Sequence, residues 1–437
     1  MNREDIVMFC VSDIAGKVRG KGFPARDLEK RLEQGVGWTP TNIMITAFSD
    51  IADTPWGPRG DLVLVPVRET EVKVDFGDGS APEHFFLCEV QNTDGTPWEC
   101  CLRRFLRGAL DDLRRETGLR IFSAFEHEFH YDGAEKRLGD AYALDAFRTQ
   151  GLFASVLLYA LRAAGIEPDG FLPEYGAGQY EVTCTPSEGA AAADAAVVLR
   201  ELAQAAARRF GHRVSFSPLV TGGSATNGVH VHFSLLDGDG RPVAYDPKAP
   251  FGLSEIAGRF VAGILKHMPA LCALTAASVV SYERLKPNQW SPTCTNLGYR
   301  DREACVRICP VPEQPGAEVA SRYNLEFRAA DGCASPYLVL GALVHAGLEG
   351  IRQTLPAPRP TTDDPEKLSP AERAERGIAR LPRSLEEALE TLERDATACA
   401  WFPDALLDAY LRHKRGEIAL VRDLDLDAQI ERYGEAY

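Results

Sequence analysis

The first part of the chain carries short apolar runs separated by Gly, Pro and Asp, a pattern that favours β-strands joined by tight turns. The runs cover residues 7–13, 43–47, 62–67 and 85–90. Gly16, Gly20 and Gly22 mark a turn-rich stretch that ends at Pro24, and residues 92–97 form a further turn cluster. We therefore predict a β-rich region that ends near residue 100.

Beyond residue 100, apolar residues recur with helical spacing, and typical start and stop residues border the segments. A helix is predicted from Leu102 to a stop at Gly118. Further helices are predicted over residues 144–164, 188–210, 254–267 and 335–351, and after a capping box at Ser384 and Glu387. Residues 356–370 are rich in Pro, Thr and Asp, so we predict an exposed loop there.

Four other segments alternate between polar and apolar residues, which is the period of a β-strand with two different faces. They cover residues 121–131, 178–184, 228–235 and 323–328. Each segment places side chains with ligand or acid–base chemistry on one face. These side chains belong to Glu126, Glu128, His130, Gln179, Glu181, Thr183, His230, His232, Ser234, Asn324, Glu326 and Arg328.

Two interpretations of these polar faces are open. Each segment by itself fits an antiparallel strand with a solvated outer face. Together, however, the faces carry glutamate and histidine and almost no lysine. Neighbouring carboxylates raise one another's pKa unless a cation compensates their charge. Carboxylate ligands with an occasional imidazole suit Mg²⁺ or Mn²⁺, and they do not fit a zinc site built from thiolates. The faces therefore indicate a site for Mg²⁺ or Mn²⁺.

A second group of candidate residues is cationic and consists of Arg284, Arg300, Arg302, Arg307 and Arg328. A guanidinium group grips carboxylate and phosphate oxygens through two parallel N–H groups. Divalent ions together with converging arginines are what phosphoryl transfer requires. The glycines at positions 16–22 do not have Walker A spacing, so a nucleotide would be held in another way. The alternative for each single arginine is a surface ion pair.

Composition narrows the class of protein. The chain has 437 residues, of which 45% are hydrophobic and 25% charged, and its formal net charge is −15. This composition is that of a globular protein with two or three domains, and the negative charge disfavours nucleic acid and membrane surfaces as partners. No signal peptide and no transmembrane run is recognisable. The eleven scattered cysteines fit reduced thiols, so we expect a cytoplasmic protein.

The same segments, in this order, resemble the glutamine synthetase superfamily, and specifically its type I-like members. Six motifs carry the resemblance over most of the chain. They are 125–129 (FEHEF), 174–181 (EYGAGQYE), 228–232 (GVHVH), 281–285 (SYERL), 300–307 (RDREACVR) and 325–328 (LEFR). The resemblance implies an α+β fold with a small N-terminal β-grasp domain, residues 1–100, and a catalytic domain, residues 101–437. The catalytic domain would contain a curved antiparallel sheet flanked by helices.

The resemblance also implies roles for single residues. One metal ion would be held by Glu128, Glu174 and Glu181, and another by Glu126, His230 and Glu326. Glutamate would be bound by Arg284 and Arg328, the transferred phosphoryl group by Arg302 and Arg307, and ATP by these two arginines with His232 and Ser234. Two or three Mg²⁺ or Mn²⁺ ions would serve each site. The sites would lie between subunits of a hexameric ring, with two rings stacked into a dodecamer.

One departure from the family bears on the substrate. In the ammonia-using enzymes, a flap after the SYERL-like motif carries a glutamate that helps to hold and deprotonate ammonium. Alignment without a gap from Arg284 to Arg307 puts Trp290 at that position. Tryptophan accepts no proton from ammonium, but its ring face suits an alkylammonium ion. The family's ammonium-binding loop is not recognisable near residues 45–58.

With Trp290 in place of the flap glutamate, the sequence resembles the glutamate–amine ligase branch of the family, most of all the γ-glutamylmethylamide synthetases. The expected reaction joins the γ-carboxylate of glutamate to a small primary amine through γ-glutamyl phosphate. We favour methylamine, because no extra carboxylates for the tail of a polyamine are recognisable near Trp290. The alternatives are a γ-glutamylpolyamine synthetase, an ordinary ammonia-using glutamine synthetase and an inactive relative; the intact set of ligand positions argues against the last.

Overall fold

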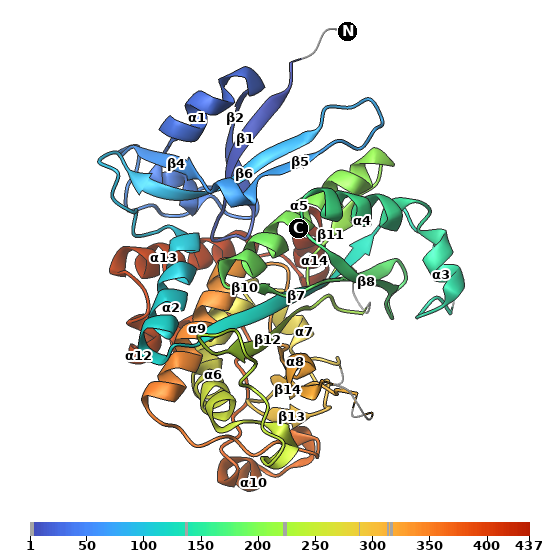
Figure 1. The fold of residues 1–437 in the computed structure, drawn as a ribbon, viewed down its shortest axis with the longest axis vertical. Helices are drawn as coiled ribbons and strands as arrows, with labels where there is room; N and C mark the ends of the chain where they lie inside the picture. Colours follow the sequence, from blue (N-terminus) through green and yellow to red (C-terminus); the bar gives the residue numbers. More distant parts are fainter. Residues whose placement is uncertain (1–3, 136–138, 222–224, 288, 313, 315–317) are drawn as a thin grey trace.

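The computed structural model describes residues 4–135, 139–221, 225–287, 289–312, 314 and 318–437. Two separate sheets organise the chain, a six-stranded one near the N-terminus and a nine-stranded one in the remainder (Figure 1). The last strand of the first sheet ends at Asn92, and the first long helix begins at Leu102. The division of the chain at residue 100 stays a prediction.

The N-terminal sheet has the strand order β2-β1-β6-β4-β3, and β5 also pairs with β6. Its strands are β1 (Ile6–Ser12), β2 (Val18–Pro24), β3 (Val36–Trp38), β4 (Leu62–Pro66), β5 (Val72–Val74) and β6 (Glu83–Asn92). The pairing of β1 with β6 is parallel and the others are antiparallel. A short helix, α1 (Leu28–Gln34), follows β2.

Two expectations for this region are wrong. The glycine-marked stretch 16–24 is a turn followed by strand β2, and Gly20 is required there because a Cβ would lie 2.0 Å from the carbonyl oxygen of Phe9. Residues 43–47 do not form a strand, because the 3₁₀ helix η2 (Pro40–Met44) occupies their start. Ile45 makes only an isolated bridge to Ile51.

The larger sheet has the order β13-β14-β15-β12-β7-β9-β8, with two short strands, β10 and β11, paired to β7. All pairings are antiparallel except that of β13 with β14, so the sheet is mixed. The strands are β7 (Arg120–Tyr131), β8 (Pro168–Pro173), β9 (Gln179–Cys184), β10 (Ser187–Glu188), β11 (Val214–Ser215), β12 (Val229–Leu236), β13 (Leu297–Tyr299), β14 (Val306–Ile308) and β15 (Leu325–Phe327). The four alternating segments of the sequence are thus neighbouring strands.

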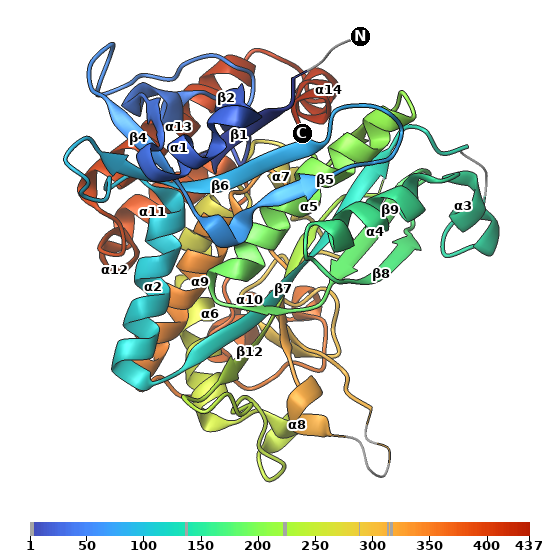
Figure 2. The ribbon, with the colours of Figure 1, turned by 45° about the horizontal axis from the view of Figure 1, so that its top comes forward.

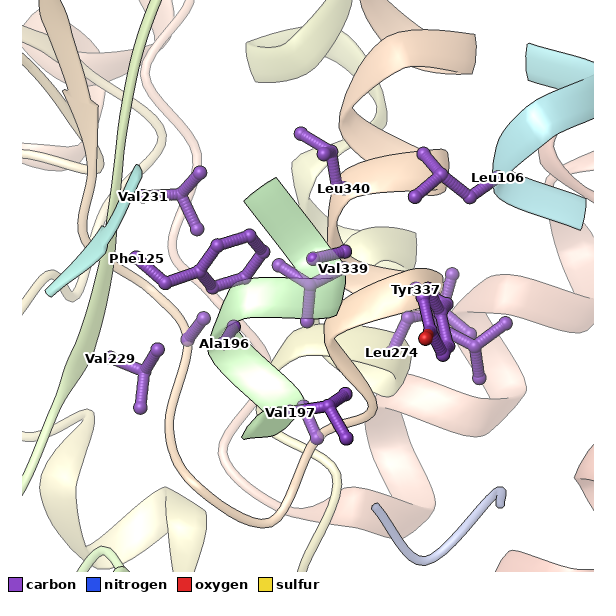
Figure 3. Packing of buried hydrophobic residues seen from close by; sticks show 14 of the residues in the cluster. Leu106, Phe125, Ala196, Val197, Val229, Val231, Leu274, Tyr337, Val339 and Leu340 are labelled. Carbon is purple, nitrogen blue, oxygen red and sulfur yellow. The ribbon is translucent and has the colours of Figure 1, made fainter. Parts of the chain in front are cut away.

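Helices cover the apolar face of this sheet. Phe125 and Val231 point toward α5 (Ala190–Arg209) and α9 (Pro336–Arg352), where Ala196 and Val339 lie (Figure 3). All four residues are buried. Behind them, α6 (Glu255–Thr275) and α2 (Leu102–Thr117) pack against α9 (Figure 2). Because side chains alternate along a strand, burial of this face leaves the glutamates and histidines on the opposite face.

The helix predictions are confirmed in part. Helix α2 ends at Gly118, which adopts the left-handed conformation expected of a helix stop. The predicted helix 144–164 is two helices, α3 (Leu144–Thr149) and α4 (Phe153–Ala163), because Gly151 has a positive φ between them. Helix α6 runs beyond residue 267 and through Pro269.

Near the C-terminus, Ser384 accepts a hydrogen bond from the backbone of Glu387, but the Glu387 carboxylate accepts from the backbone of Arg383. A complete capping box occurs instead at Ser369 and Glu372, where the segment expected to be a loop, residues 356–370, ends. The remaining helices are α7 (Ser281–Arg284), α8 (Val319–Arg322), α10 (Pro370–Glu375), α11 (Leu385–Arg394), α12 (Ala396–Cys399), α13 (Asp404–Val421) and α14 (Leu426–Ala436), and the 3₁₀ helices are η1 (Ala25–Asp27), η3 (Arg68–Thr70), η4 (Pro250–Gly252) and η5 (Pro365–Lys367).

Two findings bear on the class of protein. Ten of the eleven cysteines are buried, and all eleven are free thiols. In the part of the chain that the structure describes, no helix has the length and apolar character needed to cross a bilayer.

Candidate active site

Strand register gathers the predicted ligands on one face of the larger sheet. Glu126 of β7 lies opposite His230 of β12, and His232 of β12 lies opposite Glu326 of β15. On the other side of β7, Glu128 lies opposite Glu181 of β9. Residues directly opposite each other on neighbouring strands have Cβ atoms about 4.5–5.5 Å apart. Pairing alone therefore brings side chains from four distant sequence segments into one row.

A cavity of about 300 Å³ opens over this row. It is lined by Glu126, Glu128, Tyr142, Glu174, Tyr175, Gln179, Glu181, Ala225, Thr226, His230, Arg284, Gln289, Trp290, Arg302 and Arg328. Ten of the residues singled out in the sequence are among them, namely Glu126, Glu128, Glu174, Gln179, Glu181, His230, Arg284, Trp290, Arg302 and Arg328. Of the other predicted residues, His232 and Arg307 lie beside the cavity through their contacts with Glu126 and Glu326. Ser234 lies two residues beyond His232 on β12, opposite Phe122 of β7.

One end of the cavity has the donor set of a divalent-metal site. One donor atom each of Glu126, His232 and Glu326 lies within 4.8 Å of the other two. His232 Nδ1 is 2.9 Å from Asn324 Oδ1, whereas the buried Nε2 atom has no hydrogen-bond partner in the described residues. An imidazole fixed through one nitrogen, with the other free beside two carboxylates, is the usual arrangement of a metal-ligating histidine. These residues therefore fit a hard divalent cation.

His230, the histidine that the resemblance assigns to this metal, is placed differently. Its Nδ1 atom lies 2.8 Å from Glu126 Oε1 and 3.6 Å from Glu326 Oε1. Its Nε2 atom faces the guanidinium of Arg284 at 3.2 Å. Both imidazoles thus reach the same two carboxylates, and in this arrangement His232 offers the unpartnered nitrogen.

The charged groups at this end lie close together and change one another's pKa values. Burial raises the pKa of Glu126, but the hydrogen bond from His230 and the nearby imidazole of His232 outweigh burial and hold the pKa well below its usual range. Burial likewise opposes the lowering of the Glu326 pKa, which Arg328 and the two histidines bring to about 2. Both carboxylates are therefore ionised at neutral pH and available as ligands.

The other end of the cavity has three carboxylates and less compensation. Glu128 Oε2 accepts a hydrogen bond of 2.6 Å from the backbone N–H of Gly228. Burial and repulsion from Glu126, Glu128 and Glu174 raise the pKa of Glu181 to about 10. Burial and repulsion from Glu128 also raise the pKa of Glu174. Carboxylates that cannot all ionise without a counter-charge fit a second divalent cation at this end.

The arginines lie on the strands and loops beside the carboxylates. Arg307 of β14 donates a hydrogen bond of 2.8 Å to Glu326 Oε2. Arg284, at the end of α7, is buried and donates to the carbonyl oxygen of Arg328 at 3.0 Å. Arg302 is exposed and lines the cavity. Arg300, which shares its motif, stacks on Tyr299 and is not among the cavity-lining residues.

An aromatic wall closes the Glu174 end of the cavity, and the sequence pattern did not show it. We use this name for Tyr142, Tyr175 and Trp290. The ring of Tyr175 is 5.1 Å from that of Tyr142 and 5.3 Å from that of Trp290. The hydroxyl of Tyr142 donates to the Glu174 carboxylate at 3.0 Å. All three residues are more than half exposed, at 55%, 56% and 54%.

Only one of these three residues had a recognisable signal in the sequence. Trp290 stands out because it replaces a motif residue, whereas Tyr175 lies within a motif without an assigned role. Tyr142 is 32 residues from Glu174 and lies in no motif. Cys309 was also missed, although its Sγ atom lies 3.7 Å from Glu326 Oε2 and 3.8 Å from His232 Nδ1.

Known proteins resemble this chain over its whole length. The catalytic-domain model of glutamine synthetase matches residues 99–433, and the model of the glutamine synthetase N-terminal domain matches residues 1–98. The gamma-glutamylpolyamine synthetase GlnA3 of Streptomyces coelicolor is 35% identical over 99% of this chain and 93% of its own. The glutamine synthetase of Pyrococcus furiosus is 32% identical over 94% of this chain and 89% of its own.

Solved structures agree with these matches. The crystal structure of a novel glutamine synthase homolog superimposes with a TM-score of 0.93 at 42% identity, covering 100% of this chain and 99% of that one. The structure of a GmaS/ADP complex has a TM-score of 0.82 at 23% identity, over 97% and 95% of the two chains, and supports the fold alone. The predicted fold and family are thus confirmed: the chain belongs to the glutamine synthetase family of ATP-dependent ligases.

Proposed function

We propose that the protein is a glutamate–amine ligase that uses a small primary alkylamine, with methylamine as its substrate. The γ-carboxylate of glutamate takes the terminal phosphoryl group of ATP and releases ADP. The neutral amine then attacks the γ-glutamyl phosphate, and phosphate leaves as the amide bond forms. The product with methylamine is γ-glutamylmethylamide.

The position and contacts of Trp290 carry this proposal. The indole lines the cavity together with Glu174 and Arg302, and it packs against Tyr175. A ring at this place offers apolar area to a methyl group and a π face to an ammonium group. Burying one methyl group contributes about 0.8 kcal/mol, and a cation–π contact contributes about 0.5–2 kcal/mol. Ammonium can also contact the ring face but lacks the methyl group and is more strongly hydrated, so these contacts favour methylammonium over ammonium by roughly tenfold.

Glu174 is suited to accept the proton of the incoming ammonium. The Tyr142 hydroxyl donates a hydrogen bond to its carboxylate and orients it toward the aromatic wall, where the amine would bind. The same carboxylate would also be a metal ligand, together with Glu128 and Glu181. We therefore assign it both binding and catalytic roles.

The length of the amine is the finer question. Among the described residues that line the cavity, the carboxylates are Glu126, Glu128, Glu174 and Glu181, all of which are assigned to metal. No other carboxylate among the described cavity-lining residues is left for the distal ammonium of a polyamine, which favours methylamine. Similarity to a gamma-glutamylpolyamine synthetase favours the longer substrate. A γ-glutamylpolyamine synthetase is therefore the second candidate.

We propose the remaining roles on the basis of the cavity. Glu126, His230 or His232, and Glu326 would hold one Mg²⁺ or Mn²⁺ ion, which supplies charge neutralisation at the ATP phosphates. Arg284 would bind glutamate, as would Arg328. Arg302 and Arg307 would stabilise the transferred phosphoryl group. His232 and Ser234, whose Nε2 and Oγ atoms lack hydrogen-bond partners in the described residues, would contact ATP.

We also propose a cytoplasmic homo-oligomer, a dodecamer of two hexameric rings with sites between subunits. Gel filtration of the protein should give an assembly many times larger than its 47.8 kDa chain. A fully active monomer at assay concentration would contradict this assembly.

An amine panel tests the function directly. Phosphate release would be measured with ATP, Mg²⁺, glutamate and ammonia, methylamine, ethylamine, putrescine or spermidine at fixed pH, with concentrations corrected to the free base. We expect kcat/KM for methylamine to exceed that for ammonia at least tenfold, about 1.4 kcal/mol in transition-state binding. Equal use of both would indicate an ordinary glutamine synthetase. Preference for putrescine or spermidine would select the second candidate.

A further inference from the structure

The guanidinium group of Arg328 contacts three separate segments of the chain. Its Nη1 atom donates to the carboxylate of Glu326. Its Nε atom donates to the carbonyl oxygen of Arg302 at 2.7 Å, and its Nη2 atom donates to the carbonyl oxygen of Trp290 at 3.2 Å. The residue is buried, with 3% of its surface exposed. Three of its five N–H groups are thus directed at protein acceptors, which is more than a residue dedicated to substrate binding requires.

Trp290 has a backbone conformation that needs such support. Its φ is 53°, in the left-handed region that residues with a side chain rarely adopt. Such conformations persist where the surroundings over-determine them. Arg328 holds the carbonyl side of the residue through its hydrogen bond, and the Glu303 carboxylate lies near the backbone N–H. The residue itself is half exposed, so side-chain burial does not impose the conformation.

We infer that Arg328 is a positioning residue that sets the place of Trp290 and links it to the metal ligand Glu326. The inference rests on the proposed function only in taking Trp290 as the wall that faces the amine. A cation held by Glu326 would share that carboxylate with Arg328, because both are positive and approach the same group. Sharing weakens the Arg328–Glu326 ion pair and shifts the guanidinium fork. The shift reaches Trp290 through the hydrogen bond to its carbonyl oxygen.

The chemical consequence is a coupling between metal occupancy and the amine wall. If Mg²⁺ binding shifts the equilibrium between two positions of Trp290 by a given factor, then by linkage the Mg²⁺ affinities of the protein in these two positions differ by the same factor. The aromatic wall would adopt its working position only when the carboxylates hold their ion. Amine selection would then be poor in a site without metal.

Tryptophan fluorescence measures this coupling without any substrate. The full-length protein would be titrated with MgCl₂ alone, and the emission of a Trp290→Phe variant would be subtracted to isolate Trp290 among the five tryptophans. We expect a saturable Mg²⁺-dependent change in the wild type. In Arg328→Lys, which keeps the charge but loses the fork, the change should fall at least threefold at equal Mg²⁺ occupancy, with occupancy measured by calorimetry.

Arg322→Lys is the matched control, because Arg322 is an exposed arginine six positions away at the end of α8. It should behave as the wild type. A wild-type response in Arg328→Lys, or no Trp290 response in the wild type, would overturn the inference. The glutamate-binding role proposed for Arg328 above would by itself raise the KM for glutamate in Arg328→Lys and leave the fluorescence response unchanged, so the fluorescence response is the readout of positioning.

A second measurement covers the case in which Arg328→Lys does not fold. Trp290→Gly removes the left-handed strain and the ring, and leaves every metal ligand in place. If the two sites are coupled, its Mg²⁺ affinity should differ at least threefold from that of the wild type. Equal affinities would overturn the inference. Because neither measurement contains an amine, a failure of the amine panel and a failure of this coupling are separate results.

Discussion

The two ends of the active-site cavity are built in different ways. At one end, which we call the metal end, the candidate ligands Glu126, His232 and Glu326 project from strands β7, β12 and β15, whose pairing and buried rear face hold them. Glu326 there is 1% exposed and His230 is 3% exposed. The aromatic wall at the other end stands on loops, and its three residues are more than half exposed. Two of its members, Tyr142 and Trp290, have positive φ values of 55° and 53°.

We infer from this difference that charge neutralisation in the reaction and selection of the amine depend on different parts of the cavity. Charge neutralisation needs ligands held within tenths of an ångström, which a hydrogen-bonded sheet supplies. Recognition of one amine among several needs a surface that can change without disturbing those ligands, which loops supply. We therefore expect substitutions at the metal end to abolish turnover, and substitutions in the aromatic wall to change the preferred amine.

The largest effect is expected from removal of a metal ligand. Glu326→Ala and Glu128→Ala should each lower turnover by at least about 100-fold at saturating Mg²⁺, because each removes one ligand from a different end and unbalances the charges that remain. Phosphate release gives turnover, and calorimetry gives Mg²⁺ affinity. Glu390→Ala, at an exposed position of α11, is the control. Near-wild-type turnover in both ligand variants would remove the basis of the metal assignment.

The arginines should divide into two kinetic classes. Arg302→Ala should lower kcat by about 100-fold with little change in the KM for glutamate, because charge on the phosphoryl group develops during transfer. Arg284→Ala should chiefly raise the KM for glutamate. Steady-state kinetics in glutamate and ATP would distinguish the two patterns, and the reverse result would exchange the two roles.

Trp290→Glu should change the preference among amines more than the overall rate. It restores an acidic side chain and removes the ring, so the ratio of kcat/KM for methylamine to that for ammonia should fall about tenfold. Trp290→Phe, which keeps an aromatic face, is the control and should retain most of the ratio. An unchanged ratio in Trp290→Glu would show that amine selection lies elsewhere in the site.

The smallest effect is expected at Tyr142. Tyr142→Phe removes one hydrogen bond to Glu174 in an exposed setting, so kcat/KM for the amine should fall by about threefold to tenfold. Tyr159→Phe is a matched control, because its hydroxyl is also exposed but bonds the carbonyl oxygen of Asp75. A loss as large as that of a metal ligand would mean that the aromatic wall takes part in the chemistry itself.

What the sequence determined by itself is the metal end of the site. Period-two alternation decides which face each side chain occupies, and burial of Phe125 and Val231 on one face leaves Glu126 and His230 on the other. Because this alternation is local, the candidate ligands could be assigned to one face without knowledge of the fold. The order of the motifs then indicated the family, which the comparisons confirmed.

Only the tertiary structure decided the rest. Tyr142 meets Glu174, and Arg328 meets Trp290, across loops whose course depends on long-range packing. The same reason explains the errors at residues 43–47 and 144–164, where local apolar pattern allowed a strand or an unbroken helix. The structure has a 3₁₀ turn in one and a break at Gly151 in the other. The period of a sequence predicts which face of a helix or strand a side chain occupies. The conformation of a loop depends instead on tertiary contacts, which the local sequence does not specify.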